Sequence, residues 1–568
     1  MFVRVNTTPN SPRQSVQIVE SKRDGHKVKT KILRHVGIAL NMAELEKLKS
    51  FAYDIIVTMK KEEAAAGQKI LFPELNETGA QDARVLQDNA DKRKLGRKPP
   101  KKIEDILPLH QVTLDKISEE KRIIEGVGEI AGPIYDKLGF GSLLASKKET
   151  DMLKSLVLAR LVAPRSKHAL QKLLLDQFDK KYSLDAIYRL MDALHPRIDS
   201  IKTCVFNRTQ QLFPKGISLM LFDVTTLYFE SIETDDLRQF GYSKDHRFNT
   251  TQVVLALATN EDGLPLGYEL FKGNTAEVTT LCASIEKWKQ NLPISDVCFV
   301  GDRAMFCEAN LKLLEEKGYT YVVAAKLRNQ SAEMQRQILD ETNYHITSFA
   351  HEIGWVAEFD VKGRRLITSY KTRRSHNDAK NRGQIIDKIT KTLSKSKDTG
   401  KLISNNGIKK YTSTKGESNT QLDDNKIQAD ADWDGIHGVI TNIKEAQAQE
   451  ILQTYARLWV IEESFRINKH NLKMRPIYHW KKERIETHIS LCYMSFAVLR
   501  HLQYEVSLTQ KVSADEIMDE LLNVQASIYL HKDTHDRYRV PGHITHKASK
   551  IYKALGLIRS PDATIYFG

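Results

Sequence analysis

The alternation of apolar and polar positions is most informative between residues 217 and 325. Ile217 to Phe222 is a nearly continuous apolar run that ends at Asp223, a pattern typical of a central strand buried on both faces with a carboxylate at its C-terminal end. Two further runs, 251–259 and 264–271, flank a polar turn and predict a hairpin. The elements predicted after it are a helix over 275–291, a strand over 296–300 leading into Asp302, a helix over 306–317 and a strand over 319–325.

The predicted order is therefore β-β-β-α-β-α-β, which is the order of a ribonuclease-H-like core. The expected fold class is α/β: a mixed sheet with flanking helices, a β-rich insertion, and N-terminal β and helical domains. The expected regions are a basic N-terminal β/α region with a linker (1–102), a helical domain (103–212), the first part of the catalytic core (213–330), the β-rich insertion with a flexible segment (331–434), the last part of the core with a glutamate helix (435–505) and a C-terminal helical region (506–568).

Outside the core, the N-terminal 40 residues predict a β unit with a hairpin turn at Asp24-Gly25, followed by a helix from Ala43. Residues 110–212 have a helical pattern that Pro164 interrupts, and Ser183 is placed to cap one of the helices. The positions with helical spacing after this cap are Leu184, Ile187, Met191 and Leu194. An ordinary helical bundle and a DNA-binding helix-turn-helix both fit this region.

Beyond residue 330, a strand pair is expected near 355–370, followed by a polar stretch over 394–425 whose low hydrophobicity argues against a core. A strand over 435–442 and a single helix from Ala446 through Lys469 come next. An apolar helix over 488–502 completes the core.

The positive charge of the chain is concentrated near its N-terminus. The formal charge is +14 with a pI near 9.2, and residues 1–102 hold 21 basic against 12 acidic residues, an excess of nine. Such an excess favours a polyanionic partner. The segment 92–102 fits an exposed interdomain linker or an arm that lies along DNA phosphates. Its candidate DNA-binding residues are Lys92, Arg93, Lys94, Arg97 and Lys98.

The positions of the cysteines and the hydropathy of the chain restrict the classes of protein that fit this sequence. The five cysteines are scattered and never form Cys-x-x-Cys, so we expect reduced, mostly buried thiols rather than disulfides or a zinc site. The longest apolar runs are shorter than the roughly 20 residues that a membrane helix needs. We therefore expect a cytoplasmic protein with no membrane partner.

Three carboxylates stand where phosphodiester chemistry would need them. Asp223 and Asp302 follow strands expected to be adjacent and parallel, and a third carboxylate on a packed helix could complete two metal sites about 3.5 to 4 Å apart. Glu462 can supply it, because Tyr455, Glu462 and Lys469 are seven residues apart and would share one helix face. A polar face of this kind is also common on helices that only meet solvent. Glu463 is the rival for Glu462.

These blocks resemble the DDE transposases of bacterial insertion sequences. The stretch YARLWVIEESFRINK is similar to the IS-four-like signature of Tyr, two residues, Arg, three residues, Glu, six residues and Lys. The arginine position holds Leu458, and Arg457 stands one residue early. The apolar run before Asp223, the block GDRAMF around Asp302, GNTAE at 273–277 and KMRPIYHWKKERIETHI at 473–489 extend the resemblance over about 217–500.

The resemblance implies roles for these positions. Asp223, Asp302 and Glu462 would be the catalytic carboxylates that bind two Mg²⁺ ions, with Mn²⁺ as a substitute, while Tyr455 and Lys469 would contact DNA. Arg457 is the candidate for the signature arginine. The implied partners are the double-stranded inverted-repeat ends and target DNA, bound by a homodimer in the synaptic complex. The implied location is the nucleoid-associated cytoplasm.

Competing classes make different demands on the sequence. A tyrosine recombinase usually carries His-x-x-Arg, and none of the 18 histidines here has an arginine three residues on. His531 and His535 have metal-pair spacing but lack a third ligand, so two exposed histidines are expected. A DNA-binding remnant or regulator without catalysis, and a metal-dependent nuclease without strand transfer, remain as alternatives.

Overall fold

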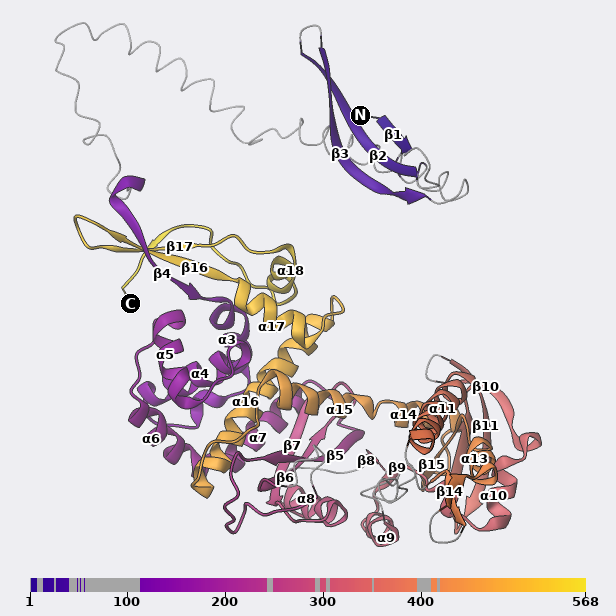
Figure 1. Cartoon of the computed structure of the whole chain (residues 1–568). Coiled ribbons are helices and arrows are strands. Elements are labelled where there is room, and N and C mark those ends of the chain that lie inside the picture. Colours follow the sequence, from indigo (N-terminus) through magenta and orange to yellow (C-terminus); the bar gives the residue numbers. More distant parts are fainter. Residues whose placement is uncertain are drawn as a thin grey trace, which may run out of the picture. The chain divides into compact units, whose positions relative to one another are not determined.

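The computed structural model describes two compact units, Met1–Gln111 and Val112–Gly568. The described residues are 2–7, 14–24, 27–39, the single positions 49, 52 and 56, and 113–567 without 243–248, 292–296, 303–306, 350–351, 396–409 and 416–418. Figure 1 shows the chain with its elements labelled.

The first unit contains an antiparallel three-stranded sheet in the order β1-β2-β3. Its strands are β1 (Phe2–Thr7), β2 (Gln14–Asp24) and β3 (Lys27–Ala39). Asp24 pairs with Lys27, which confirms the predicted hairpin. A small apolar cluster joins Val16 and Ile18 to Ala52 and Ile56. The helix predicted from Ala43 falls almost wholly outside the described residues, and the segment 92–102 falls entirely outside them.

The second unit is a mixed α/β structure built around a nine-stranded sheet in the order β10-β11-β12-β15-β9-β8-β5-β6-β7. The strands of the predicted core are β5 (Leu219–Tyr228), β6 (Gln252–Thr259), β7 (Pro265–Lys272), β8 (Cys298–Gly301) and β9 (Thr320–Ala324). With α8 (Glu277–Asn291) and α9 (Glu308–Glu316) between them, they confirm the predicted order β-β-β-α-β-α-β. The pairs β5–β8 and β8–β9 are parallel, and the other pairs of the sheet are antiparallel.

Strand β5 extends further than its sequence predicts. The apolar run predicted a strand that ends at Asp223, but β5 continues to Tyr228 because antiparallel pairing with β6 persists as far as Tyr228 opposite Gln252. What ends near Asp223 is the pairing with β8, whose last partners are Leu221 and Val300. Asp223 thus lies in the middle of a strand, two residues beyond the end of its parallel ladder.

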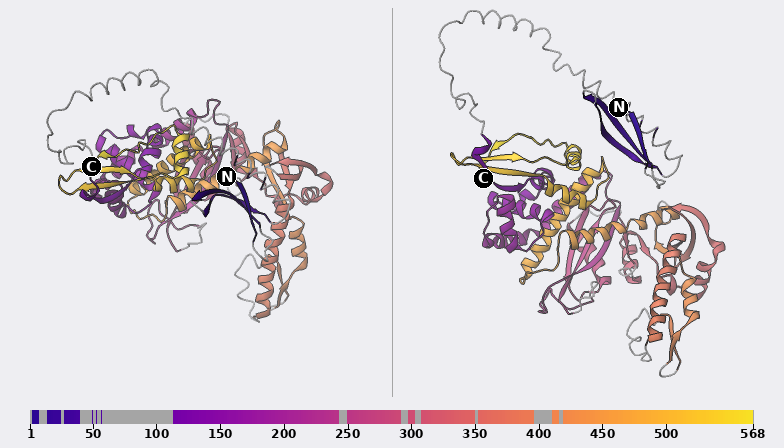
Figure 2. Two further views of the ribbon diagram at one scale, coloured as in Figure 1. Left: turned by 90° about the horizontal axis from the view of Figure 1, so that it is seen from above. Right: turned by 45° about the horizontal axis from the view of Figure 1, so that its top comes forward.

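The strands of the predicted insertion lengthen this sheet. They are β10 (His345–Phe349), β11 (Glu352–Val361) and β12 (Arg364–Tyr370), and β12 pairs with β15 (Ile436–Thr441), which pairs in turn with β9. The helix α11 (Thr372–Lys395) follows β12, and its orange ribbon projects from this end of the sheet in Figure 2.

In the polar stretch 394–425, whose low hydrophobicity argued against a core, the structure describes 394–395, 410–415 and 419–425. It contains β13 (Thr412–Lys415) and β14 (Asn419–Leu422), and α13 (Asp424–Ala431) follows. Tyr411 is only 2% exposed, and its hydroxyl donates a 2.5 Å hydrogen bond to Asp430. This hydrogen bond joins the segment before β13 to α13.

The helical region before the core matches its prediction and adds one strand. Its longer helices are α4 (Lys147–Val162), α5 (Lys167–Phe178), α6 (Leu184–Leu194) and α7 (Ile198–Gln211), joined to the short α3 (Gly132–Lys137). The break at Pro164 and the cap at Ser183 are both present, and the Ser183 hydroxyl accepts a 3.2 Å hydrogen bond from the Ala186 N–H. The strand β4 (Ile117–Ile124) was not predicted.

The C-terminal region 506–568 contains strands as well as helices. The helices α17 (Ala514–Asn523) and α18 (His546–Ala554) accompany β16 (Gln525–His531), β17 (Arg537–Pro541) and β18 (Thr564–Ile565), which form a four-stranded sheet with β4. His531 is buried rather than exposed. Its Nδ1 accepts hydrogen bonds from the backbone N–H groups of Asp533 and Thr534.

Two remaining expectations concern the thiols and the membrane. All five cysteines are free, but only Cys492 is fully buried and the other four are partly exposed. None of the helices in the described part of the chain combines the length and hydropathy that crossing a bilayer requires.

Candidate active site: carboxylates around strand β5

Asp223 faces one particular side of the sheet. Strand β5 separates two hydrophobic clusters: Leu221 and Leu227 belong to the cluster that includes the C-terminal helices of the core, whereas Phe222 and Val224 belong to the cluster that includes α8. Because side chains alternate along a strand, Asp223 shares the face of Leu221 and Leu227. It is partly buried, and its Oδ1 accepts a 2.7 Å hydrogen bond from the Val224 N–H.

Asp302 comes to the same edge of the sheet. The parallel register places Leu221 opposite Val300, and its continuation by two residues would bring Asp223 opposite Asp302. Val300 belongs to the same cluster as Leu221, so the alternation assigns both aspartates to one face. Neighbouring strands lie about 4.8 Å apart, which is close enough for two carboxylates to share a cation. Asp302 is exposed at the end of β8.

Glu462 lies on a helix that packs on this face. The helix α15 (Trp459–Arg466) contacts β5 and β6 through buried apolar residues, among them Ile461 and Phe465, which are 0% and 7% exposed. Glu462 follows Ile461 and is exposed. The helix therefore brings its carboxylate to the side of the sheet that carries Asp223.

The rival carboxylate has a different environment. Glu463 Oε2 lies 3.1 Å from Nη1 of Arg500 on α16 (Lys482–Ser507), and Arg500 is only 5% exposed. An acid that neutralises a buried guanidinium is unsuited to bind a second cation. If the carboxylate moved to a metal ion, the guanidinium would remain buried without a counter-charge. Of the two neighbours, Glu462 is the one available for ligand chemistry.

The helix that carries this glutamate is not the single helix that the sequence predicts. It consists of α14 (Ala448–Ala456), a break at Arg457-Leu458, α15 and a π-helical turn at Ile467–Asn471. The backbone tightens at the break, where the Leu458 N–H bonds the Tyr455 carbonyl three residues back. It widens at the π turn, where the Leu472 N–H bonds the Ile467 carbonyl. The seven-residue spacing of Tyr455, Glu462 and Lys469 thus does not place them on one regular helix face.

Continued beyond its last pair, the register of β5 and β8 would place two of the three predicted metal ligands, Asp223 and Asp302, beside each other. Within the described part of the chain, no three His, Cys, Asp or Glu side chains form a group that could hold a metal ion, so Glu462 is not part of such a group. The donor chemistry still fits a hard divalent cation, since Asp223 and Asp302 present carboxylate oxygens from adjacent strands and a third carboxylate lies on the covering helix. Such a site can neutralise charge on a phosphoryl group and orient an attacking oxygen.

The family model for the transposase DDE domain matches residues 214–497, which is half of the chain and includes all three carboxylates. The chain belongs to the DDE transposase family. The cryo-EM structure of the piggyBac transposase synaptic complex with hairpin DNA is similar to this transposase at 9% sequence identity and a TM-score of 0.35, covering 70% of this chain and 77% of that one. No curated protein matches the chain.

The other residues of the predicted signature lie on α14, at the break after it and in the π turn that follows α15. Tyr455 on α14 is partly buried, and its ring packs against that of His437 on β15, with centroids 5.0 Å apart. Arg457 forms an ion pair with Glu261 in the turn between β6 and β7. Lys469 is partly buried in the π turn. The predicted cations Lys92, Arg93, Lys94, Arg97 and Lys98 lie outside the described residues of the transposase.

Arg500 is a positioning residue that the sequence analysis missed. Its guanidinium pairs with Glu463 and donates 2.9 Å hydrogen bonds to the carbonyl oxygens of Asp262 and Gly263. It thereby ties α15 and α16 to the β6–β7 turn. The sequence did contain a signal for this role. Arg500 directly follows the apolar stretch 489–499 within the predicted helix 488–502, and a cation in such a position indicates a buried charge with a specific partner.

Proposed function

We propose that this transposase cleaves DNA at the inverted-repeat ends of a bacterial insertion sequence of the IS-four-like branch and joins them to target DNA. Its core would be ribonuclease-H-like, with Asp223, Asp302 and Glu462 as catalytic residues. The observation that carries the proposal is the parallel pairing of β5 with β8, whose register, continued by two residues, would bring Asp223 opposite Asp302 on the face that α15 contacts. The match to the DDE family supports it.

The chemistry requires a divalent metal, as in the DDE family generally. Two bound Mg²⁺ ions, or Mn²⁺ in their place, would activate the attacking oxygen and stabilise the leaving one. The two strand aspartates would hold the metal from the rigid sheet, and Glu462 would close the site from α15. Ile461 and Phe465 anchor α15 in the core, so the proposal requires the Glu462 carboxylate to approach the two aspartates when the metal binds.

The proposed DNA contacts come from several elements. Tyr455, Arg457 and Lys469 would contact the transposon end, and Lys92, Arg93, Lys94, Arg97 and Lys98 would lie along the DNA phosphates. For Arg457 this requires exchanging the Glu261 carboxylate for a phosphate, which is feasible because its side chain is 41% exposed. A homodimer would bring two ends together, with one core acting on each.

A strand-transfer assay tests the proposal. The full chain is incubated with Mg²⁺, a DNA fragment carrying the ends of the element, and a target plasmid. Joined products are expected from the wild type, and none from Asp223→Asn, Asp302→Asn or Glu462→Gln, while end binding by these variants is largely kept because each removes a charge without changing shape. Cleavage without joined products would indicate a nuclease, and binding without cleavage would indicate an inactive DNA-binding protein. Strand transfer by any of the three variants would refute that residue's assignment.

A further inference from the structure

A second basic site lies in the helical region, where a pocket of about 590 Å³ opens between the α4–α5 break, the segment 473–479 and α16. This volume falls in the usual range of small-ligand sites, about 300 to 1,000 Å³. The basic residues that line it are Arg160, Arg165, Lys167, His168, Lys473, Arg475, His479 and His488. No aspartate or glutamate is among the described residues that line it. The segment 473–479 is part of the stretch KMRPIYHW, to which the proposed chemistry assigns no role.

Two of these cations are buried without a carboxylate. Arg160 and Lys167 are each only 4% exposed. Arg160 donates through Nη2 to the Lys473 carbonyl at 3.0 Å, but its buried Nε has no hydrogen-bond partner. Lys167 Nζ lies 3.4 Å from Nδ1 of His488. Burying charge without an opposite charge is costly, so this pair favours an anion that enters from solvent.

The backbone favours an anion at the same place. The helix α5 begins at the pocket, where Ser166 caps it by accepting a 3.3 Å hydrogen bond from the Ala169 N–H. The residues Ser166 to Ala169 all line the pocket, so the positive end of the helix dipole and the first-turn N–H groups lie against it. The helix end and the two buried cations are independent features that converge on one cavity.

Burial is the main cause of the pKa shifts in the pocket, and the neighbouring positive charges add to it. Burial, together with the neighbouring Arg160, lowers the pKa of Lys167 to about 7. Burial and the charges of Lys167, Arg484 and Arg160 lower the pKa of His479 to about 3. An anion in the pocket would oppose both shifts.

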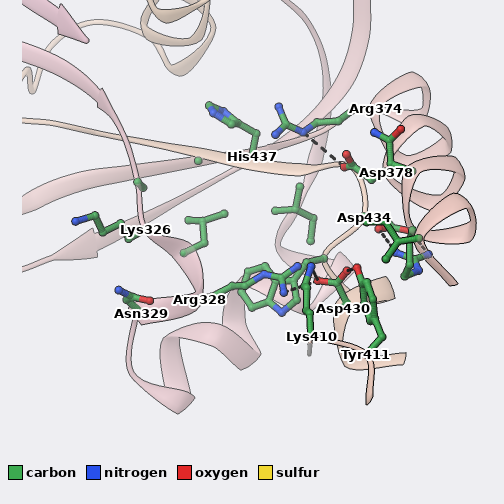
Figure 3. A pocket seen from close by; sticks show the side chains of 18 residues that line it. Lys326, Arg328, Asn329, Arg374, Asp378, Lys410, Tyr411, Asp430, Asp434 and His437 are labelled. Atoms are coloured by element: carbon green, nitrogen blue, oxygen red, sulfur yellow. Dashed lines mark hydrogen bonds and ion pairs between the residues drawn. The ribbon is translucent and has the colours of Figure 1, made fainter. Parts of the chain in front are cut away.

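Another pocket with several cations in its lining illustrates how acidic side chains of the protein can pair with such cations. It has a volume of about 610 Å³ and lies between α11, α13 and β15, as Figure 3 shows. There Arg382 pairs with both carboxylate oxygens of Asp434, and Arg328 and Lys410 both pair with Asp430 at 2.6 and 2.7 Å. In that pocket acids of the protein pair with Arg382, Arg328 and Lys410, whereas no acid is among the described residues that line the pocket at α5.

We propose that the pocket at the N-terminus of α5 binds a phosphate group carried by a DNA strand. The anion site itself is independent of the function proposed above, and only its DNA source rests on it. The backbone links the pocket to the candidate active site: the Ile477 N–H donates to the Tyr228 carbonyl at 3.2 Å, and Tyr228 ends the strand that carries Asp223. Tyr228 lies five residues beyond Asp223 on β5, a separation of roughly 17 Å, so a single strand of DNA can reach both the pocket and the candidate active site.

Exposed aromatic residues beside the pocket suit this ligand. Tyr478 and Trp480 are 62% and 58% exposed, and the Arg238 guanidinium lies 5.3 Å from the centroid of the Trp480 ring. Rings held at the surface beside cations provide stacking surfaces for bases of a strand whose phosphate is bound. Free phosphate has no base that could stack on these rings.

Thermal unfolding in inorganic phosphate tests the anion site. Phosphate should raise the Tm of the wild type relative to chloride at equal ionic strength, because a ligand that binds only the folded state stabilises it. The increase should be lost in Lys167→Met and reduced in Arg165→Gln. Arg165 is exposed, so its variant folds even if the buried substitution does not. Lys148→Met is the matched control, since Lys148 is an exposed cation at the start of α4, the helix that carries Arg160 near its other end.

The salt dependence of DNA binding tests the source of the phosphate. For a short DNA duplex with a single-stranded overhang, Arg165→Gln and Lys167→Met should each reduce the slope of log affinity against log salt by up to about 0.9, the value expected for one neutralised phosphate. Lys148→Met should leave it unchanged.

The possible results separate the two proposals. A phosphate-induced Tm increase that is equal in all four proteins would overturn the anion site, and intact DNA binding would leave the proposed function standing. An increase that depends on Lys167 and Arg165, with unchanged DNA slopes, would overturn DNA as the source and indicate free phosphate. Failure of the wild type to bind DNA at all would count against the proposed function, and the Tm measurement would still decide the anion site.

Discussion

Nη1 of Arg500 lies 3.1 Å from Oε2 of Glu463, and this ion pair joins the two helices that cover the face of Asp223. The same guanidinium donates to the backbone carbonyls of Asp262 and Gly263 in the β6–β7 turn, and Arg457 pairs with Glu261 in that turn. The turn is therefore held to α14–α15 at two points. Glu462 lies between these two contacts along the chain, so its position depends on them.

The neighbouring glutamates should respond oppositely to the same substitution. Glu463→Gln leaves the buried Arg500 without its counter-charge, so the free energy of unfolding should fall by about 2 kcal/mol. Glu462→Gln changes an exposed group, so stability should stay within about 0.5 kcal/mol while strand transfer falls more than about a hundredfold. Urea denaturation and the strand-transfer assay measure the two effects. The assignment would be reversed if Glu463→Gln proved inactive but stable.

Gly263 should tolerate no side chain. Its φ is +78°, and a Cβ placed there would lie 1.6 Å from Nη2 of Arg500. Gly263→Ala must displace the buried guanidinium in addition to straining the backbone, so the free energy of unfolding should fall by more than about 2 kcal/mol. Gly318→Ala is the control, because Gly318 has a similar φ of +76° with nothing within 4 Å of its Cβ position. That variant should lose only about 1 kcal/mol. Equal losses in the two variants would argue against the clash.

The charge network around Arg364 should make stability depend on acid pH. Arg364 is buried on β12 and contacts both carboxylate oxygens of Glu315 at 2.7 and 3.0 Å, as well as Glu308 at 2.8 Å. Its hydrogen bonds lower the pKa of Glu315 and of Glu308 below their ordinary value of 4.5. Folded chains therefore bind fewer protons than unfolded ones. The resulting stabilisation is fully present above pH 4.5 and is lost as the pH falls through the lower folded-state values.

Substitution of Arg364 should remove this dependence. Arg364→Met should lower the free energy of unfolding by about 3 kcal/mol at neutral pH, because it leaves Glu315 without its partner. The difference from the wild type should shrink below pH 4.5, where the carboxylates become protonated. Lys388→Met on α11 removes an exposed cation that does not contribute to the pKa shift of either glutamate, and it serves as the control. Denaturation curves across this pH range provide the measurement, and a difference that stays constant would contradict the mechanism.

Removal of the N-terminal region should weaken DNA binding. Residues 1–102 carry an excess of nine positive charges, and the sequence predicts phosphate contacts from the segment 92–102. A chain that begins after residue 102 should bind DNA less tightly and with a smaller salt slope, by about 0.9 for each phosphate that is no longer neutralised. The affinity measured across a salt series decides this. An unchanged slope would show that these cations do not contact DNA.

The periodicity of the sequence was sufficient to predict the central elements. The apolar run before Asp223, the hairpin at 260–263 and the order of strands and helices through Ala325 are determined by local patterns, and the structure contains them. The hairpin at Asp24 and the cap at Ser183 are likewise local, because each depends on a few neighbouring residues. The types of residue at the candidate site, two strand aspartates and a helix glutamate, could also be identified from the chain alone.

The hydropathy pattern could not show how long the strands are or which strands pair with one another. The length of β5 depends on its pairing with β6, and the strands of the insertion join the core sheet through β12 and β15, which are more than 60 residues apart in the chain. The break at Arg457-Leu458 falls within a continuous helical pattern, and its position coincides with contacts to the β6–β7 turn. Each of these features depends on partners that are distant in sequence.

The choice between Glu462 and Glu463 shows this division most clearly. The sequence by itself determined that a glutamate follows Ile461 on a helix with one apolar face, since that face must be buried. Only the tertiary structure decided which acid remains available, by placing Arg500 against Glu463 and leaving Glu462 exposed. The same holds for the pocket at α5, where cations from three separated segments meet and no acid is among the described lining residues. Local patterns are set by neighbours along the chain, whereas the charge that a side chain experiences is set by whatever the fold brings beside it.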